Sequence, residues 1–237
     1  MTAEEPPGYE EGEPPCGRLP GSGDYTLVMD GCHVYPAEPP SSFLYKLNSP
    51  VCQAAAKVYR VEKIRYRLSD NDGEGRIMSR LDYIYDFQTK FRYHSFNHFR
   101  PQVIVEGKTS KTRTYKAVTI SPSVTGWTSC SAEGHFKAKT SLRDRFNKEV
   151  RILWKNRAGA LVAVEMRRRD GGDESLPRLQ IKIPLGEQDL DLLVTCWAAR
   201  LWKEAEKEME QPLTWKGAMR TLGRKDNWFG RGTAHLI

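Results

Sequence analysis

The sequence DLLVTCWAARLW, residues 191–202, is the strongest structural signal in the chain. Apolar side chains fall on every side of the helix that it predicts, whereas a helix lying on a protein surface shows a single apolar stripe. The helix must therefore be enclosed by the rest of the chain on almost all sides. The residues expected to fill the centre of the fold are Leu190, Leu193, Val194, Trp197 and Leu201.

The residues before this stretch indicate where the helix begins. Pro184 and Gly186 end the preceding β-type run. Glu187, Asp189 and Asp191 then gather where the positive end of a helix dipole favours acidic side chains. We therefore expect the helix to begin near Glu187.

The chain from Asp24 onward contains short β-type runs separated by Gly, Pro, Asn and Asp, which is typical of an antiparallel meander. In the clearest run, residues 57–68, apolar and charged residues nearly alternate, so that one face is apolar and the other is basic. The expected strands are residues 25–29, 43–45, 56–68, 77–87, 103–106, 115–120, 127–130, 135–139, 150–155, 160–167 and 179–183.

A closed sheet wrapped around the apolar helix would bury that helix and leave no sheet edge unpaired. We therefore predict a mainly β fold, a closed antiparallel β-barrel of about 12 strands around a central apolar C-terminal α-helix. Trp154 and Trp197 are expected to pack in the core. Cys196 lies in the middle of the apolar helix and should be an inert, buried thiol.

The composition divides the chain into three parts. Residues 1–23 are dense in Pro, Gly and Glu and are expected to form a disordered acidic tail. Residues 24–207 hold the predicted barrel and its helix. Residues 208–237 form a basic C-terminal extension with aromatic residues at Trp215, Trp228 and Phe229.

The net charge of the chain is +7, although residues 1–24 carry six acidic residues and one basic residue. The remainder is therefore more basic than the total indicates. Such a surplus favours anionic partners, either phospholipid headgroups or nucleic acid, but solubility alone also accounts for it.

The cysteine pattern and the apolar runs indicate in which cellular compartment the protein is expected. The five cysteines are far apart and include no CxxC pair, so a reducing compartment is the simpler interpretation. The N-terminus lacks the features of an export signal, and no apolar run approaches the roughly 20 residues that span a bilayer. We expect a cytoplasmic protein, with peripheral membrane or nuclear association left open.

The order of these elements resembles the tubby C-terminal-like superfamily. Short strands precede the turn-separated runs 150–155, 160–167 and 179–183 and then the helix core 191–202, and LVAVE at residues 161–165 matches in residue type. This group includes tubby-like proteins, plant LURP-one-related proteins, phospholipid scramblases and uncharacterised fungal domains. The resemblance implies that this chain is one of the uncharacterised fungal members. Over residues 24–207 the resemblance implies a barrel of about a dozen strands with the helix through its centre.

The functional motifs of the better-known members have no counterpart in this sequence. It contains no acidic cluster like the scramblase calcium segment, no palmitoylatable cysteine cluster and no match to the phosphoinositide-binding positions of tubby. The resemblance therefore supports the fold and only weakly supports lipid binding, because fold and function are separate claims.

No catalytic residues are predicted, because GxSxG, HExxH and P-loop patterns are absent from the sequence. His94 and His98 have the spacing of two ligands on one helical face, but no acidic third ligand is near, so no metal site is predicted. Arginines and aromatic rings alternate around these histidines in residues 91–100 and would suit base stacking or lipid insertion. The favoured interpretation is a pair of core-facing strands joined by a loop. We expect a non-enzymatic protein without a cofactor.

A basic loop is the candidate binding site. Residues 140–147 are expected to form a basic loop that could clamp phosphate groups, joined by Arg167, Arg168 and Arg169 if their strand is a neighbour. A merely solvated loop is the alternative. The candidate anion- or lipid-binding residues are Lys137, Lys139, Arg143, Arg145, Lys148, Arg167, Arg168 and Arg169.

Three functions follow as hypotheses. The first is a non-enzymatic tubby-like domain that binds anionic phospholipid, such as a phosphoinositide, or a protein partner through its basic surface. The second is a nucleic-acid-associated regulatory protein. The third is a small-molecule-binding barrel or enzyme, which would need a cavity where the central helix is expected. The ligand and the oligomeric state stay open.

Overall fold

The computed structural model describes residues 24–39, 41–69, 76–91, 101–109, 113–140, 149–168 and 176–210. The expected acidic tail, the C-terminal extension beyond residue 210, and both His94 and His98 lie outside these residues. The described strands are β1 (Tyr25–Asp30), β2 (His33–Pro36), β3 (Tyr45–Leu47), β4 (Val58–Ser69), β5 (Arg76–Phe91), β6 (Pro101–Gly107), β7 (Val118–Ser123), β8 (Gly126–Ala132), β9 (Phe136–Thr140), β10 (Glu149–Asn156), β11 (Leu161–Arg168) and β12 (Arg178–Ile181). A short 3₁₀ helix, η1 (Val51–Gln53), precedes β4, and the helix α1 (Glu187–Met209) follows the last strand.

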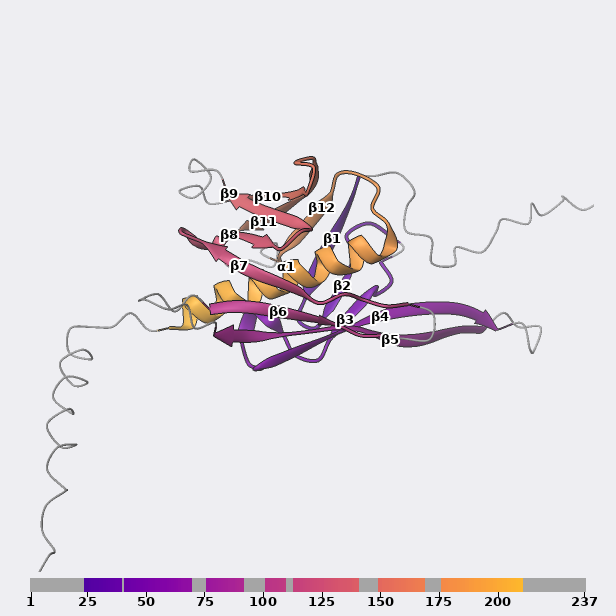
Figure 1. Cartoon of the computed structure of the whole chain (residues 1–237). Coiled ribbons are helices and arrows are strands. Elements are labelled where there is room, and N and C mark those ends of the chain that lie inside the picture. The colour runs from indigo at the N-terminus through magenta and orange to yellow at the C-terminus, as the bar shows by residue number, and fades with distance from the viewer. Residues whose placement is uncertain are drawn as a thin grey trace, which may run out of the picture.

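The strands form one closed antiparallel barrel (Figure 1). Each strand pairs with the next strand along the chain, and β12 pairs with β1 to close the sheet. At this closure Tyr25 lies opposite Ile181, and Leu27 lies opposite Leu179. The predicted mainly β fold, with a closed barrel of 12 strands, is confirmed.

The helix α1 is packed inside the barrel (Figure 1). It begins at Glu187, as predicted, after Pro184 has ended the β series. Every residue from 190 to 203 is buried, which is about four helical turns. The predicted central residues Leu190, Leu193, Val194, Trp197 and Leu201 are all among them.

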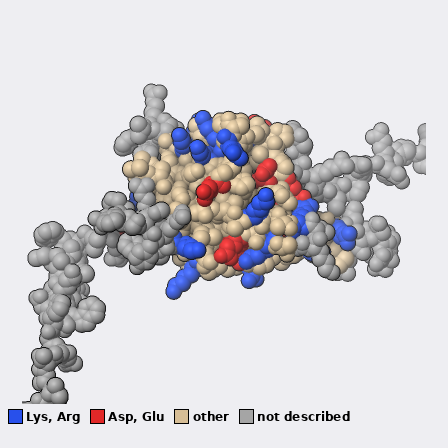
Figure 2. Space-filling view, in the orientation of Figure 1, with Lys and Arg blue, Asp and Glu red and all other residues tan. Residues whose placement is uncertain are grey.

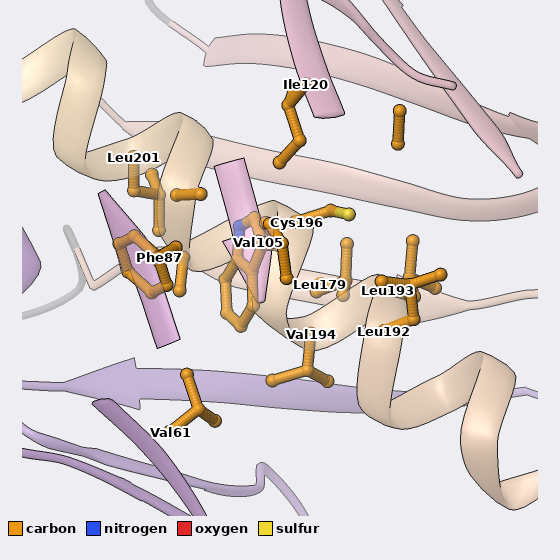
Figure 3. Close-up of a cluster of buried hydrophobic side chains, with 14 of the residues drawn as sticks. Val61, Phe87, Val105, Ile120, Leu179, Leu192, Leu193, Val194, Cys196 and Leu201 are labelled. Carbon is orange, nitrogen blue, oxygen red and sulfur yellow. The ribbon is translucent and has the colours of Figure 1, made fainter. Parts of the chain in front are cut away.

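Strand side chains from around the barrel converge on the helix (Figure 3). Val61, Phe87, Val105, Ile120 and Leu179 come from five different strands, and each is almost completely buried. Burying one such side chain contributes about 1.5–3 kcal/mol. The barrel and the helix therefore stabilise each other, because neither can bury its apolar side chains alone.

Both tryptophans that were expected to pack in the core lie there. Trp154 on β10 and Trp197 on α1 are both almost fully buried, as expected. Cys196 is also fully buried, and burial raises the pKa of its thiol well above the usual value. The expected inert thiol agrees with this environment, because thiolate formation is disfavoured there.

Several strands differ from the predicted positions, and β2, β3 and β7 are examples. β2 has no counterpart among the predicted strands, because it is four residues long and ends in a proline. β3 is shifted toward the C-terminus by two residues from the predicted 43–45. β7 begins at Val118 rather than at residue 115 and continues through Pro122, where a register irregularity accommodates the residue without an N–H donor.

Candidate functional site

Two of the predicted anion-binding residues lie on the outside of β9. Lys137 and Lys139 are exposed, whereas their neighbours Phe136, Ala138 and Thr140 are buried. Successive side chains in a strand point to opposite faces of the sheet. Lys137 and Lys139 therefore project side by side from the outer face of the barrel.

The strands beside β9 extend this basic region. On β10, Lys155 lies directly opposite Lys137. Arg151 on β10 and Arg178 on β12 both lie opposite Met166 on the intervening strand β11, so that they form one row across three strands. We call this region the basic outer surface, and its residues are Lys137, Lys139, Arg151, Lys155 and Arg178, all of them exposed.

The basic outer surface has an apolar middle. Leu153, Val164 and Met166 project from β10 and β11 between the basic residues and are half-buried. The described carboxylate of these strands, Glu165, points the other way, into the barrel. Figure 2 shows Lys and Arg side chains gathered over the part of the barrel where Figure 1 places β9 to β12.

The other predicted anion-binding residues cannot be placed in the same way. Arg143, Arg145, Lys148 and Arg169 lie outside the described residues. The backbones of Arg167 and Arg168 belong to β11, opposite residues 150 and 149 of β10, and their side chains are not described.

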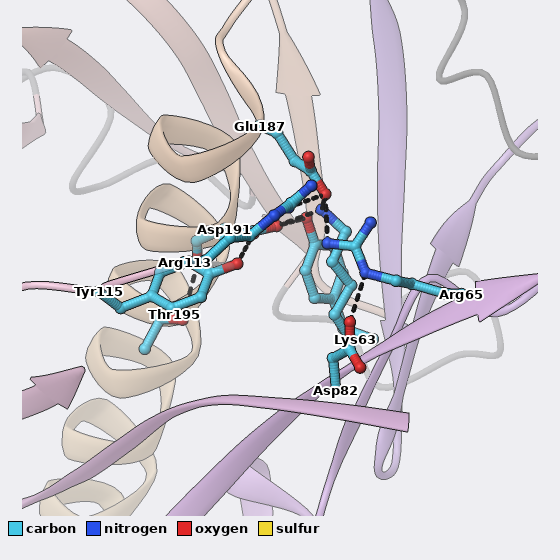
Figure 4. A network of polar contacts seen from close by, with 9 residues as sticks. Lys63, Arg65, Asp82, Arg113, Tyr115, Glu187, Asp191 and Thr195 are labelled. Carbon is cyan, nitrogen blue, oxygen red and sulfur yellow. Dashed lines mark hydrogen bonds and ion pairs between the residues drawn. The ribbon is translucent and has the colours of Figure 1, made fainter. Parts of the chain in front are cut away.

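A second polar site, which the sequence did not predict, lies where the helix begins (Figure 4). Asp191 on α1 is fully buried. Its Oδ1 accepts hydrogen bonds from the hydroxyl of Tyr45 and from Nζ of Lys63, both at 2.7 Å. Its Oδ2 accepts one from the hydroxyl of Tyr115 at 3.0 Å. A buried carboxylate is tolerated because these donors replace water.

Glu187, one turn before Asp191, meets three cations. Its Oε1 lies 2.7 Å from Nζ of Lys63, 2.6 Å from Nη2 of Arg65 and 2.5 Å from Nη1 of Arg113. Burial alone would raise the pKa of Glu187, but hydrogen bonds from Arg113, Lys63 and Arg65 outweigh it and lower the pKa to about 2. Arg65 also pairs with Asp82 of β5 at 2.5 Å.

These contacts define the mouth network, which consists of Tyr45, Lys63, Arg65, Asp82, Arg113, Tyr115, Glu187 and Asp191. Burial and the Asp191 carboxylate together raise the pKa of Tyr25 and of Tyr115 to about 12. Both phenols therefore stay protonated near neutral pH. The network joins β3, β4, β5 and the segment before β7 to the first turns of α1, and this attachment fixes where the helix enters the barrel.

A buried ion pair holds the middle of the helix. Nε of Arg200 donates to Oε2 of Glu165 at 2.8 Å, and Nη2 of Arg200 contacts Oε1 of the same carboxylate. Nε1 of Trp154 also donates to Glu165, at 3.3 Å, and Glu204 accepts from Nη1 of Arg200. Burial alone would lower the pKa of Arg200, but the two carboxylates raise it, so the guanidinium is charged.

The charged residues inside the helix are the signal that could have identified both networks. Asp191 and Arg200 interrupt a helix that is apolar on every face. A charged residue at such a position must be paired, because an unpaired buried charge is too costly. The sequence does not show the partners, since Lys63 lies 128 residues from Asp191 along the chain.

Three properties of the described residues concern metal binding, cysteine reactivity and membrane crossing. These residues contain no group of three His, Cys, Asp or Glu side chains placed to hold a metal ion. Burial raises the pKa of Cys130 to about 12, which disfavours a nucleophilic thiolate there. Among the described residues, no helix is both long enough and apolar enough to cross a membrane.

Comparison of the chain with family models, with curated proteins and with solved structures found no match. The class of protein that the structure itself defines is a 12-strand closed antiparallel β-barrel with one C-terminal helix packed inside.

Proposed function

We propose that this chain is a non-enzymatic, tubby-like barrel that docks on anionic phospholipid through the basic outer surface. The observation that carries the proposal is the arrangement of Lys137, Lys139 and Lys155 on adjacent strands, with Arg151 and Arg178 completing the surface. All five side chains are exposed. The resemblance of the sequence pattern to the tubby C-terminal-like superfamily agrees with this proposal but does not carry it.

The mechanism is electrostatic attraction followed by shallow apolar contact. Each Lys or Arg near an anionic membrane surface contributes about 1 kcal/mol, so five of them provide useful but reversible binding. The half-buried side chains of Leu153, Val164 and Met166 lie between the cations. They would meet the boundary between headgroups and acyl chains once the cations have brought the barrel to the surface.

The surface lies on rigid strands, which favours binding of this kind. β9, β10, β11 and β12 hold their outward side chains in fixed register on the barrel. Their inner faces contribute Trp154, Glu165 and Leu179 to the core and to the buried ion pair. Binding would therefore require little rearrangement, which keeps the entropic cost of association low.

Co-sedimentation with vesicles tests this function. Purified full-length protein is mixed with phosphatidylcholine vesicles, with the same vesicles containing phosphatidylserine or a phosphoinositide, and with duplex DNA as a non-lipid anion. We expect binding to the anionic vesicles, little binding to neutral vesicles, and a decline as salt is raised. Equal binding to neutral vesicles, or tighter binding to DNA than to anionic vesicles at the same salt, would overturn the proposal.

A further inference from the structure

The chain enters the barrel beside the basic outer surface. β1 pairs with β12, one of the strands of that surface, and Tyr25 lies opposite Ile181. Because Ile181 points into the barrel, its neighbour Lys182 points outward. One residue before Tyr25, Asp24 accepts hydrogen bonds through Oδ1 from Nζ of Lys182 at 3.3 Å and from Nε2 of Gln180 at 3.0 Å. The acidic residue directly before β1 is therefore bound to the cation directly after β12.

Lys182 lies in line with two cations of the basic outer surface. Its backbone N–H donates to a carbonyl of β11 at 2.8 Å. The neighbouring residue of β11, Leu161, lies opposite Lys155 of β10, and Lys155 in turn lies opposite Lys137 of β9. The three lysines therefore form one row across the outside of the barrel, and this row begins beside Asp24.

The sequence before this point is opposite in charge to the surface. Residues 1–23 contain five acidic residues and a single basic residue, although the whole chain has a net charge of +7. The three acids nearest to the barrel lie 11 to 14 positions before residue 24. We call them the acidic triplet, and its residues are Glu10, Glu11 and Glu13. Opposite charges at this proximity along the chain favour an internal contact.

The acidic triplet is close enough along the chain to reach the whole row of lysines. Lys155 and Lys137 belong to strands that are three and four positions from β1 in the barrel. Neighbouring strands are about 4.8 Å apart, so these lysines lie about 14 Å and about 19 Å from Asp24 along the sheet. Eleven residues of extended chain span up to about 36 Å. Contact with either lysine therefore requires no full extension of the chain.

The other side of β1 does not favour an acidic segment. β2 is the second neighbour of β1, and residues 33–45, which include β2, contain no Lys or Arg. The backbone N–H of Ala37 donates to the carbonyl of Thr26 at 2.8 Å, and the exposed Glu38 follows directly. An acidic segment that precedes β1 is therefore repelled on the β2 side and attracted on the β12 side.

We propose that residues 1–23 bind across the basic outer surface and compete there with anionic lipid. The ion pair between Asp24 and Lys182 is the first contact of this interaction, and the acidic triplet supplies the next ones. Each exposed ion pair is weak, but the tether to β1 raises the effective concentration of the segment at the surface to the order of millimolar. This inference rests on the proposed lipid docking and adds its regulation, because the segment must be displaced before the barrel can dock.

Carbodiimide cross-linking of the full chain tests the internal contact without any lipid. The reagent joins a carboxylate to an amine only where the two groups touch, and mass spectrometry identifies the linked pairs. We expect the acidic triplet to be linked to lysines of the basic outer surface, with a yield that declines as salt is raised. The matched control lysines, exposed elsewhere on the barrel, are Lys46, Lys57 and Lys116.

Two results of this cross-linking would overturn the proposal. The first is equal linkage of the acidic triplet to the control lysines and to the basic outer surface, or no linkage to that surface. The second is linkage mainly between chains, which a mixture of isotope-labelled and unlabelled protein distinguishes from linkage within one chain.

Neutralising the acidic triplet tests the competition with lipid. In co-sedimentation with phosphatidylserine vesicles, the variant Glu10→Gln, Glu11→Gln and Glu13→Gln should bind at least about fivefold more tightly than the wild type, because a tethered competitor is weakened. The control variant makes the same change in net charge at exposed acids outside β1 and β9–β12, and its substitutions are Glu106→Gln, Glu208→Gln and Glu210→Gln. Equal tightening by the two variants would contradict the competition, since net charge alone would then account for it.

The two measurements separate failure of this inference from failure of the proposed function. Cross-links on the basic outer surface, with no vesicle binding by either the wild type or the triplet variant, would support the internal contact and overturn lipid docking. Vesicle binding by the wild type that the triplet variant does not improve would leave lipid docking in place and overturn the competition.

Discussion

The guanidinium of Arg200 on α1 and the carboxylate of Glu165 on β11 form an ion pair in the interior of the barrel, with Nε 2.8 Å from Oε2 and both side chains fully buried. Arg200 lies near the middle of the helix α1, and Glu165 lies on β11 in the barrel that surrounds the helix. The pair therefore specifies which strand faces which side of the helix, because a rotated helix would leave the Glu165 carboxylate without its cation and Arg200 with Glu204 as its carboxylate partner.

Removing one member of this pair should be costly. Arg200→Met leaves the Glu165 carboxylate buried without its cation, and we expect the free energy of unfolding to fall by about 3–5 kcal/mol. Urea denaturation followed by circular dichroism measures the loss. The double variant Arg200→Met with Glu165→Leu should recover much of it, because no buried charge is left. A single variant as stable as the wild type would contradict the structural role of the pair.

Substitution of Asp191 should also lower the stability of the fold. Asp191→Asn weakens three contacts, with Tyr45, Lys63 and Tyr115, and it leaves the buried ammonium of Lys63 with Glu187 as its remaining carboxylate. We expect a loss of about 3 kcal/mol in the free energy of unfolding. Asp189→Asn is the matched control, because Asp189 is exposed in the same turn of α1. Equal effects of the two substitutions would refute the role of the mouth network.

Stability should depend on pH through Glu187. The pKa of this carboxyl is about 2 in the folded protein, against 4.5 for the unperturbed side chain. The folded protein holds this proton more weakly than the unfolded chain. The stabilisation is therefore fully present above about pH 5 and is lost as the pH falls toward about 2. Its size is modest, because Glu187 is partly exposed and solvent screens its ion pairs.

The measurement is the difference in urea midpoint between the wild type and Glu187→Gln as a function of pH. We expect this difference to be largest near neutral pH and to shrink through the acidic range. Glu133→Gln, on the exposed turn between β8 and β9, removes a carboxylate elsewhere and should produce little difference at any pH. A difference for Glu187→Gln that does not change with pH would show that its ion pairs are not stabilising.

Gly107 at the end of β6 should tolerate no side chain. An added Cβ would lie 2.1 Å from the backbone oxygen of Tyr115, so the backbone itself would have to move. Gly107→Ala should lower the free energy of unfolding by about 1–3 kcal/mol. At Gly186 an added Cβ would meet its nearest neighbour at an ordinary 3.7 Å. Gly186→Ala should therefore cost less, and the reverse order in thermal unfolding would contradict this packing.

Much of the fold follows from the composition of the helix. Because residues 190–202 present apolar side chains on every face, an enclosing sheet is the physical solution, and the meander pattern supplies its strands. β2 was missed because four residues that end in a proline provide too little periodicity for detection. The closure of β1 on β12 joins residues 150 or more positions apart and has no local signal.

The candidate sites were less predictable. The spacing of Lys137 and Lys139 places them on one face of a strand, and that face is solvent-exposed. Lys155 and Arg178 belong to the same basic outer surface because of the register between strands, and the local sequence does not specify that register. In β4 the alternation of apolar and charged residues is present, but Lys63 points inward because Asp191 is there to receive it.

The most direct test of the proposed function is a charge-reversal comparison. The variant Lys137→Glu, Lys139→Glu and Lys155→Glu changes the basic outer surface. The control variant Lys46→Glu, Lys57→Glu and Lys116→Glu makes the same change in net charge at exposed lysines outside β9–β12. In co-sedimentation with anionic vesicles we expect the first variant to lose at least about tenfold in affinity, and the control to lose much less. Equal binding by the two variants would contradict a lipid-docking role for this surface.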